Sequence, residues 1–232
     1  MIFVIGDIHG MKEKYDEMLE KMAPADTDAV FVLGDVIDVG EDSISILKDM
    51  MYRANIYPVL GEHEYIARKV LPLITGFSSI EEALEKLSGE DKELLESWLT
   101  MKSEKTISDF LSLSDEDKES IIDYLSEFQS YEEIKAGGKT FVLAHAGIRD
   151  FTAEKELDDY SDEDFVFAQT DYSAPVFKNK YLITGHMPTV AINPKLMGKV
   201  YSKNGHIALD CGAAFGGTLA GICLDKLKMF YC

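Results

Sequence analysis

The pattern of apolar and polar positions along the chain repeats one local arrangement five times. A short apolar run is followed closely by Gly or Ala and then by Asp, Glu or His. Short apolar runs that end at glycine are typical of buried strands. The pattern therefore predicts five strands that each end beside a side chain able to bind a metal ion. The runs are residues 3–5, 31–33, 59–60, 141–143 and 182–183.

Between the first three runs, apolar residues recur at helical spacing and predict two amphipathic helices. The two apolar stripes comprise Tyr15, Met18, Leu19 and Met22, and then Ile44, Leu47 and Met51. Strands that alternate with helices are joined by crossover connections, which are typical of parallel strands. The sequence therefore predicts an α/β fold.

From about residue 79 to residue 128 the strand pattern stops and a helical insertion is predicted. Ser79 with Glu82, and Ser114 with Asp117, have the spacing of a capping box at a helix start. The leucines of this segment and Trp98 are expected to pack against the sheet. A binding surface made of these residues is the alternative.

The second half of the chain is expected to add antiparallel strands, so that the sheets are mixed. Gly137-Gly138 predicts a hairpin turn between residues 131–136 and 139–145. Residues 207–210, 219–225 and 229–232 are expected to form one C-terminal antiparallel group. Candidate metal ligands extend from Asp7 to His186 without a linker-like segment, so residues 1–232 are predicted to form a single domain.

The charge balance narrows the set of partners. With 42 acidic residues against 23 basic ones, the formal net charge is -19. Such a surface repels phosphate backbones and anionic lipid headgroups, so neither nucleic acid nor a membrane is expected as a partner. No apolar run approaches the roughly 20 residues that span a bilayer. A cytoplasmic protein is expected, and its three cysteines are too few for a disulfide framework.

Four of the five histidines lie just beyond a predicted strand: His9, His63, His145 and His186. One histidine in such a place is usually structural, but several His and Asp residues at the ends of neighbouring strands converge on one crevice. Asp7 is two residues before His9, which puts both side chains on one side of an extended chain. Oxygen and imidazole ligands together suit Mn, Fe or Zn. The sequence therefore predicts a metal site.

Five motifs together resemble the calcineurin-like metallophosphoesterases, and specifically the phosphoprotein phosphatase (PPP) family of the bacterial serine/threonine type. The motifs are Gly6-Asp7-Ile8-His9-Gly10, Gly34-Asp35-Val36-Ile37-Asp38, Gly61-Glu62-His63-Glu64, His145-Ala146-Gly147 and Gly185-His186. The resemblance implies a four-layer αββα sandwich of two mixed sheets. It also implies two divalent metal ions, for which manganese is expected and iron, zinc or magnesium are alternatives.

The resemblance also assigns roles to individual residues. It implies that Asp7 and His9 bind the first metal, that Asp35 bridges both metals, and that Glu62, His145 and His186 complete the second. It further implies that His63, oriented by Asp38, protonates the leaving alkoxide. A carboxylate that only stabilises its turn is the alternative for Asp38.

The sequence also departs from the family pattern. Glu62 occupies the position where the family usually has a ligating Asn, and Val39, Leu60 and Gln169 stand where the family has arginines. Arg149, just after the His145 motif, is the candidate that could contact substrate, with a plain surface role as the alternative. Capture of a phosphate by an arginine fork is therefore not expected.

The expected activity is dinuclear, metal-dependent hydrolysis of phosphomonoesters. The expected partner is a phosphorylated substrate, either a phosphoprotein carrying phosphoserine or phosphothreonine or a small phosphate ester. A symmetrical dinucleoside tetraphosphatase is one alternative, although such an enzyme would need cations for the polyphosphate. A metal-binding regulator with weak catalysis is the other.

Overall fold

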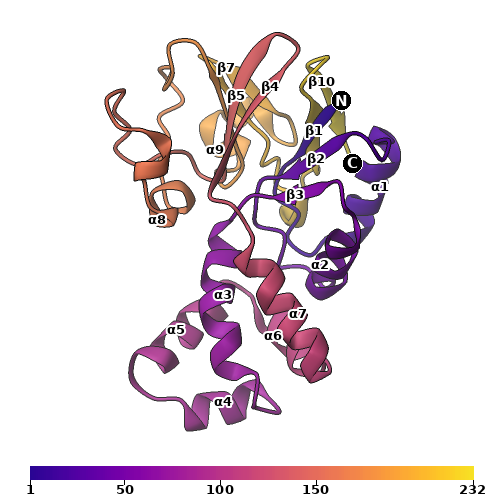
Figure 1. Cartoon of the computed structure of the whole chain (residues 1–232), viewed down its shortest axis with the longest axis vertical. Helices are drawn as coiled ribbons and strands as arrows, with labels where there is room; N and C mark the ends of the chain where they lie inside the picture. The colour runs from indigo at the N-terminus through magenta and orange to yellow at the C-terminus, as the bar shows by residue number, and fades with distance from the viewer.

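The computed structural model describes residues 1–232 and contains two five-stranded sheets (Figure 1). In the first sheet the strand order is β10-β9-β1-β2-β3. Strands β1, β2 and β3 are parallel, whereas β9 is antiparallel to both β1 and β10. The bounds are β1 (Ile2–Ile5), β2 (Ala29–Val32), β3 (Ile56–Pro58), β9 (Ala220–Cys223) and β10 (Lys228–Tyr231).

The second sheet has the order β4-β5-β6-β8-β7, with β5, β6 and β8 parallel and the two edge strands antiparallel. The predicted hairpin joins β4 to β5, and Gly137 and Gly138 have φ angles of 53° and 76° that suit this turn. The bounds are β4 (Tyr131–Ala136), β5 (Lys139–Ala144), β6 (Tyr181–Thr184), β7 (Tyr201–Lys203) and β8 (His206–Ala208).

The two sheets pack face to face through one buried apolar cluster. Val4 and Phe31 of the first sheet share this cluster with Phe141 and Ile183 of the second. Because side chains alternate along a strand, Phe3 and its neighbours on β1 and β2 face the other way, toward helices. The sheets therefore form the two inner layers of a sandwich.

Helices cover the outer faces of both sheets and complete the predicted αββα arrangement (Figure 1). On the first sheet these are α1 (Lys12–Met22) and α2 (Ser43–Tyr52), whose apolar stripes were expected. On the second sheet, Val142 and Leu182 pack with Phe165 of α8 (Asp162–Val166). The short helix α9 (Thr189–Ile192) follows β6.

The helical insertion is present and extends away from the sheets in Figure 1. It comprises α4 (Ile80–Lys86), α5 (Gly89–Leu99), α6 (Glu104–Leu111) and α7 (Asp115–Ser126), and it packs against the preceding helix α3 (Glu62–Ile74). Ser79 and Ser114 cap α4 and α7 by accepting backbone hydrogen bonds, as predicted. Leu95 and Trp98 are buried, but α5 packs against α3 and not against a sheet as expected. None of the helices combines the length and apolar character that a bilayer crossing needs.

The predicted C-terminal antiparallel group is wrong in part. Strands β9 and β10 do pair antiparallel, but β8 lies in the other sheet, parallel to β6. Strand β7 was not predicted, and it pairs with β8 across a turn at Asn204-Gly205. Strand length and apolarity do not reveal which sheet a strand joins, because that choice depends on where the preceding chain has packed. The fifth histidine, His206, is buried on β8 and bonds to the Ala174 carbonyl.

Candidate metal centre

The predicted ligands meet where the parallel strands of both sheets end. Asp7 and His9 follow β1, Asp35 follows β2, and Glu62 begins α3 just after β3. From the second sheet, His145 and His186 follow β5 and β6. Most of these residues line or underlie one cleft with a volume of about 370 Å³. The fold therefore brings together candidate ligands from the two sheets, although these residues are far apart in the sequence.

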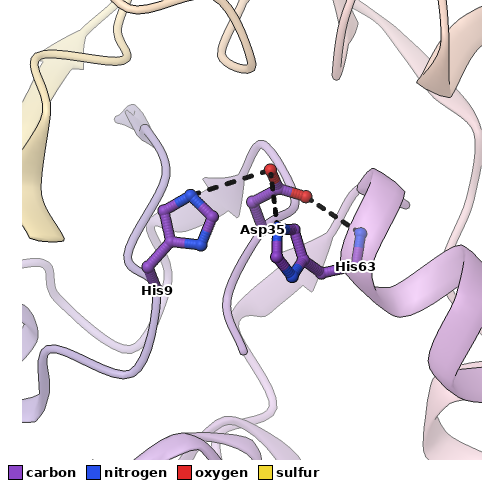
Figure 2. Close-up of side chains that lie close together, drawn as sticks. All are labelled: His9, Asp35 and His63. Atoms are coloured by element: carbon purple, nitrogen blue, oxygen red, sulfur yellow. Dashed lines mark hydrogen bonds and ion pairs between the residues drawn. The ribbon is translucent and has the colours of Figure 1, made fainter. Parts of the chain in front are cut away.

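The Asp35 carboxylate lies between two groups of candidate ligand atoms. Figure 2 shows His9 and His63 turned toward it, with His9 Nε2 3.8 Å from Asp35 Oδ2. On its other side, His145 Nε2 lies 3.3 Å from Asp35 Oδ1. One group is His9, Asp35 and His63, and the other is Asp35, His145 and His186. A carboxylate shared by two groups is what a bridging metal ligand requires.

Backbone carbonyls orient two of the histidine rings. Nδ1 of His145 lies 2.7 Å from the Leu33 carbonyl oxygen, and Nδ1 of His9 lies 3.3 Å from that of Ile37. Because a carbonyl only accepts, each Nδ1 donates a proton, and Nε2 of each ring has a free lone pair whenever the ring is neutral. This is the usual arrangement of a metal-binding histidine.

Three buried polar atoms of the centre have no hydrogen-bond partner: Asp7 Oδ1, Asp38 Oδ1 and His145 Nε2. The other Asp7 oxygen accepts from the backbone N–H of His186 at 2.8 Å. An unpaired buried polar atom is costly, and coordination to a cation would satisfy Asp7 Oδ1 and His145 Nε2. The residues therefore fit bound divalent metal ions.

The loops that carry the candidate ligands have an uncommon backbone conformation. His9, Asp35 and His186 have φ angles of 49°, 47° and 59°, in the left-handed region. Such strain concentrates at functional sites, where the surrounding structure holds it in place. Here Glu64 helps to hold it, since its carboxylate accepts the backbone N–H groups of Asp35 and Val36 at 2.8 Å each.

His63 and Asp38 form the expected hydrogen-bonded pair, 2.7 Å apart between Nδ1 and Oδ2. The indole N–H of Trp98 donates to the same Asp38 oxygen, also at 2.7 Å. Asp38 is fully buried, so it has little solvent to compete with these two donors. The sequence predicted core packing for Trp98, with a binding surface as the alternative, and nothing in the local pattern indicates a contact across 60 positions.

Burial and neighbouring charges set the protonation of the centre in the metal-free chain. Burial disfavours a charge on His63, but Asp35 and the bond to Asp38 outweigh it and raise its pKa to about 9. The pKa of His145 is raised to about 10, because the Asp35 charge outweighs burial. Burial and the nearby His145 lower the pKa of His186 to about 4. The centre therefore combines protonated and neutral imidazoles at neutral pH.

Asp210 is a residue of the cleft that sequence reasoning did not assign. It follows β8 and lines the cleft, and Gly212 N–H donates to its carboxylate at 2.9 Å. Burial raises the pKa of Asp210 to about 6, and both burial and Asp210 raise that of Asp7. The sequence held a signal for it, since Asp210 follows an apolar run as the candidate ligands do.

The candidate substrate residue Arg149 has other partners in this structure. Its guanidinium donates to the Phe167 carbonyl at 3.3 Å, lies 3.9 Å from Asp164, and is not among the residues that line the cleft. Of the three positions where the family has arginine, Val39 lines the cleft. Leu60 is buried in the core and Gln169 is exposed away from the cleft.

An αββα sandwich with a His/Asp centre at its strand ends defines a class of metal-dependent proteins. Within this class, the sequence model of the calcineurin-like phosphoesterases matches residues 1–205, and the chain belongs to that family. The calcineurin-like family and the sandwich fold that the motifs predicted are thereby confirmed, whereas the bacterial serine/threonine phosphatase type stays a prediction. Membership makes the chain a phosphoesterase-type hydrolase whose family uses two divalent metal ions.

Similar proteins carry two kinds of names. A symmetrical bis(5'-nucleosyl)-tetraphosphatase from Wigglesworthia glossinidia brevipalpis is 32% identical over 100 residues, which are 42% of this chain and 36% of that protein. The match thus spans about a third of that relative.

Two solved structures are similar in fold. A candidate diadenosine tetraphosphatase has a TM-score of 0.65 at 17% identity, with 100% of this chain and 92% of that one covered. A protein serine/threonine phosphatase from Saccharomyces cerevisiae has 0.55 at 13%, covering 95% and 72%.

Proposed function

We propose that the chain is a phosphohydrolase that works with two divalent cations, manganese first among them. Asp7, His9 and Asp35 would hold one ion, and Asp35, Glu62, His145 and His186 the other. The observation that carries the proposal is the Asp35 carboxylate, which lies between His9 on one side and His145 and His186 on the other, beside unpaired buried atoms of Asp7 and His145. When bound, such ions polarise the phosphoryl group and activate water for in-line attack.

The residues of the chain supply the proton for the leaving group. His63 has Nδ1 engaged by Asp38, so its Nε2 faces the cleft, 4.0 Å from Asp35 Oδ2. The raised pKa of His63 keeps Nε2 protonated at neutral pH in the metal-free chain. An imidazolium in this place can donate its proton to the departing oxygen, and Asp38 stabilises the ring orientation that this transfer needs.

We propose dinucleoside polyphosphates as the first substrate class to test. Two relatives carry that name, and an apolar hollow of about 220 Å³ adjoins the cleft and shares Pro188 and Phe215 with it. Its lining includes Met197, and Phe215 is 61% exposed, as a face for a planar base requires. Phosphomonoesters, including phosphoserine and phosphothreonine, are the second substrate class. The scarcity of cationic side chains in the cleft favours them, because a monoester carries less negative charge than a polyphosphate.

The test is turnover on a panel of phosphate esters by protein reconstituted with Mn²⁺, Fe²⁺, Zn²⁺ or Mg²⁺. The panel holds diadenosine tetraphosphate, a phosphoserine peptide, nitrophenyl phosphate and an alkyl phosphate. Symmetrical cleavage of the first compound gives two molecules of ADP, and asymmetrical cleavage gives ATP and AMP. The expected result is release of ADP with the highest kcat/KM of the panel.

Asp35→Asn is the control variant, because it removes the shared carboxylate charge from a folded chain. It should lose metal and turnover together, as measured by metal analysis, circular dichroism and rate. A wild-type protein that binds two ions and hydrolyses nothing would refute the enzyme and leave the regulator alternative. Preference for the phosphoserine peptide would reverse the order of the two substrate classes.

A further inference from the structure

The cleft has many carboxylates and one cationic side chain other than histidine. Among the residues that line it, Asp35, Glu62 and Asp210 are acidic and Lys102 is the one lysine, with no arginine. Lys102 lies between α5 and α6, in the helical insertion, where the sequence analysis assigned no function. The chain's three arginines are engaged elsewhere, by Asp49, Asp162 and Asp164.

The Lys102 ammonium has no carboxylate partner. Its recorded contact is with the ring of Phe215, whose centroid lies 5.4 Å from Nζ. That ring is in turn 6.0 Å from the ring of His9, a candidate metal ligand. A charged group that is exposed and unpaired next to a metal centre is available to an anionic ligand.

The backbone holds Lys102 beside the position where the family has an arginine. The Val39 N–H donates to the Lys102 carbonyl oxygen at 3.0 Å. The turn between α5 and α6 is stabilised by Ser103, whose hydroxyl donates to the Trp98 carbonyl oxygen at 2.9 Å. Lys102 therefore starts from the same edge of the cleft as residue 39, although it is 63 positions further along the chain.

We propose that Lys102 binds the substrate phosphate and so replaces the family's arginine, whose position Val39 occupies in this chain. Lysine serves as a point charge for phosphate where arginine would supply a planar fork, so its flexible stem can follow the anion into the cleft. This inference rests on the proposed phosphohydrolase function, and it names the residue that recognises the substrate. It also places part of the substrate site on the helical insertion.

The test measures binding of inorganic phosphate by calorimetry and steady-state kinetics on the metal-loaded protein. Lys102→Met should weaken phosphate binding about tenfold, the loss expected when one charge-assisted hydrogen bond is removed. KM should rise by a similar factor, while kcat changes less than about twofold. Lys102→Arg should retain phosphate binding, because it keeps the positive charge. If the side chain had a merely structural role, the Arg and Met variants would bind phosphate equally well.

Lys105→Met is the matched control, because it removes one positive charge from an exposed lysine three positions away that pairs with Asp109. It should leave phosphate binding unchanged. Equal losses in the two Met variants, or wild-type binding by Lys102→Met, would overturn the proposal. If the wild type hydrolyses no ester of the panel but Lys102→Met alone weakens phosphate binding, the phosphohydrolase function fails and the anion site stands.

Discussion

At the scale of single residues, His63 is the group whose role can be separated from metal binding. His63→Asn should slow hydrolysis of alkyl phosphates by about 10²–10⁴, because their leaving oxygens need a proton. Nitrophenyl phosphate should be affected much less, because nitrophenolate leaves without one. The measurement is the hydrolysis rate of wild type and variant on both esters at confirmed metal occupancy. Equal losses of rate on the two esters would show that His63 has another role.

The histidines of the centre also predict how stability depends on pH without metal. The folded pKa values of His63 and His145, about 9 and 10, lie above the ordinary value of 6.5. A histidine whose pKa is raised by folding stabilises the fold fully below pH 6.5 and loses that contribution as the pH rises through its folded pKa. The pKa values of the Glu64 and Asp210 carboxyls are also raised, to about 7 and about 6, so the protonation of these groups changes little above pH 7. They therefore contribute little to the change of stability above that pH.

We therefore expect the Tm of the metal-free protein to fall by several degrees between pH 7 and pH 9. The measurement is thermal unfolding in excess chelator across this range. His63→Asn should show a shallower fall, because one of the two titrating groups is removed. A Tm that stays constant from pH 7 to pH 9 in the wild type would contradict the raised pKa values.

At the scale of elements, helix α5 reaches from the insertion to the hydrogen-bonded pair of His63 and Asp38 through the Trp98–Asp38 hydrogen bond. Trp98→Phe keeps most of the buried apolar volume and removes the indole N–H. Because Asp38 would lose a donor, His63 should be held less firmly, and alkyl phosphate turnover should fall about tenfold relative to nitrophenyl phosphate.

The ratio of the two turnover rates separates this role from packing. Phe110→Leu is the comparison, since Phe110 is fully buried in the same cluster and has no bond to Asp38. It should lower the Tm without changing the ratio. A Trp98→Phe variant that lowers the Tm and keeps the wild-type ratio would limit Trp98 to packing.

The elements also show why part of the fold could be predicted from the sequence. Strands β1, β2, β5 and β6 were predictable because each is an apolar run that stops near a glycine or alanine beside a candidate ligand, a purely local signal. The helix starts at Ser79 and Ser114 were predictable from capping chemistry for the same reason.

The non-local features were not predictable in this way. The sheet that β8 joins, the hydrogen bond of Trp98 and the position of Lys102 each depend on how distant segments pack. Asp210 is an intermediate case, since its local pattern matched that of the other ligands but lay in a segment interpreted only as a closing strand.

At the scale of the whole molecule, one apolar cluster of 34 buried residues connects the first sheet with the insertion. It includes Phe3 of β1 and also Trp98 and Phe110 of the helices α5 and α6. We therefore propose that residues 1–232 form one cooperative folding unit, as the sequence predicted.

Unfolding of the metal-free protein should then occur in a single transition. Far-UV circular dichroism follows the helices and sheets together, and fluorescence of Trp98, the one tryptophan, follows the insertion. The two denaturant curves should coincide. A separate earlier transition in the fluorescence alone would mean that the insertion unfolds independently.

The position of the metal centre between the two sheets has a consequence for the lifetime of the protein. Asp7 and Asp35 come from one sheet and Asp210 from the other, and burial or mutual repulsion acts on these carboxylates when no cation is present. Ions that bind the folded chain and not the unfolded one add about 2.7 kcal/mol at a free concentration of 100 Kd. Scarcity of divalent cations would thus expose the chain to proteases more often, so the same ions that support hydrolysis would also regulate how long each molecule survives.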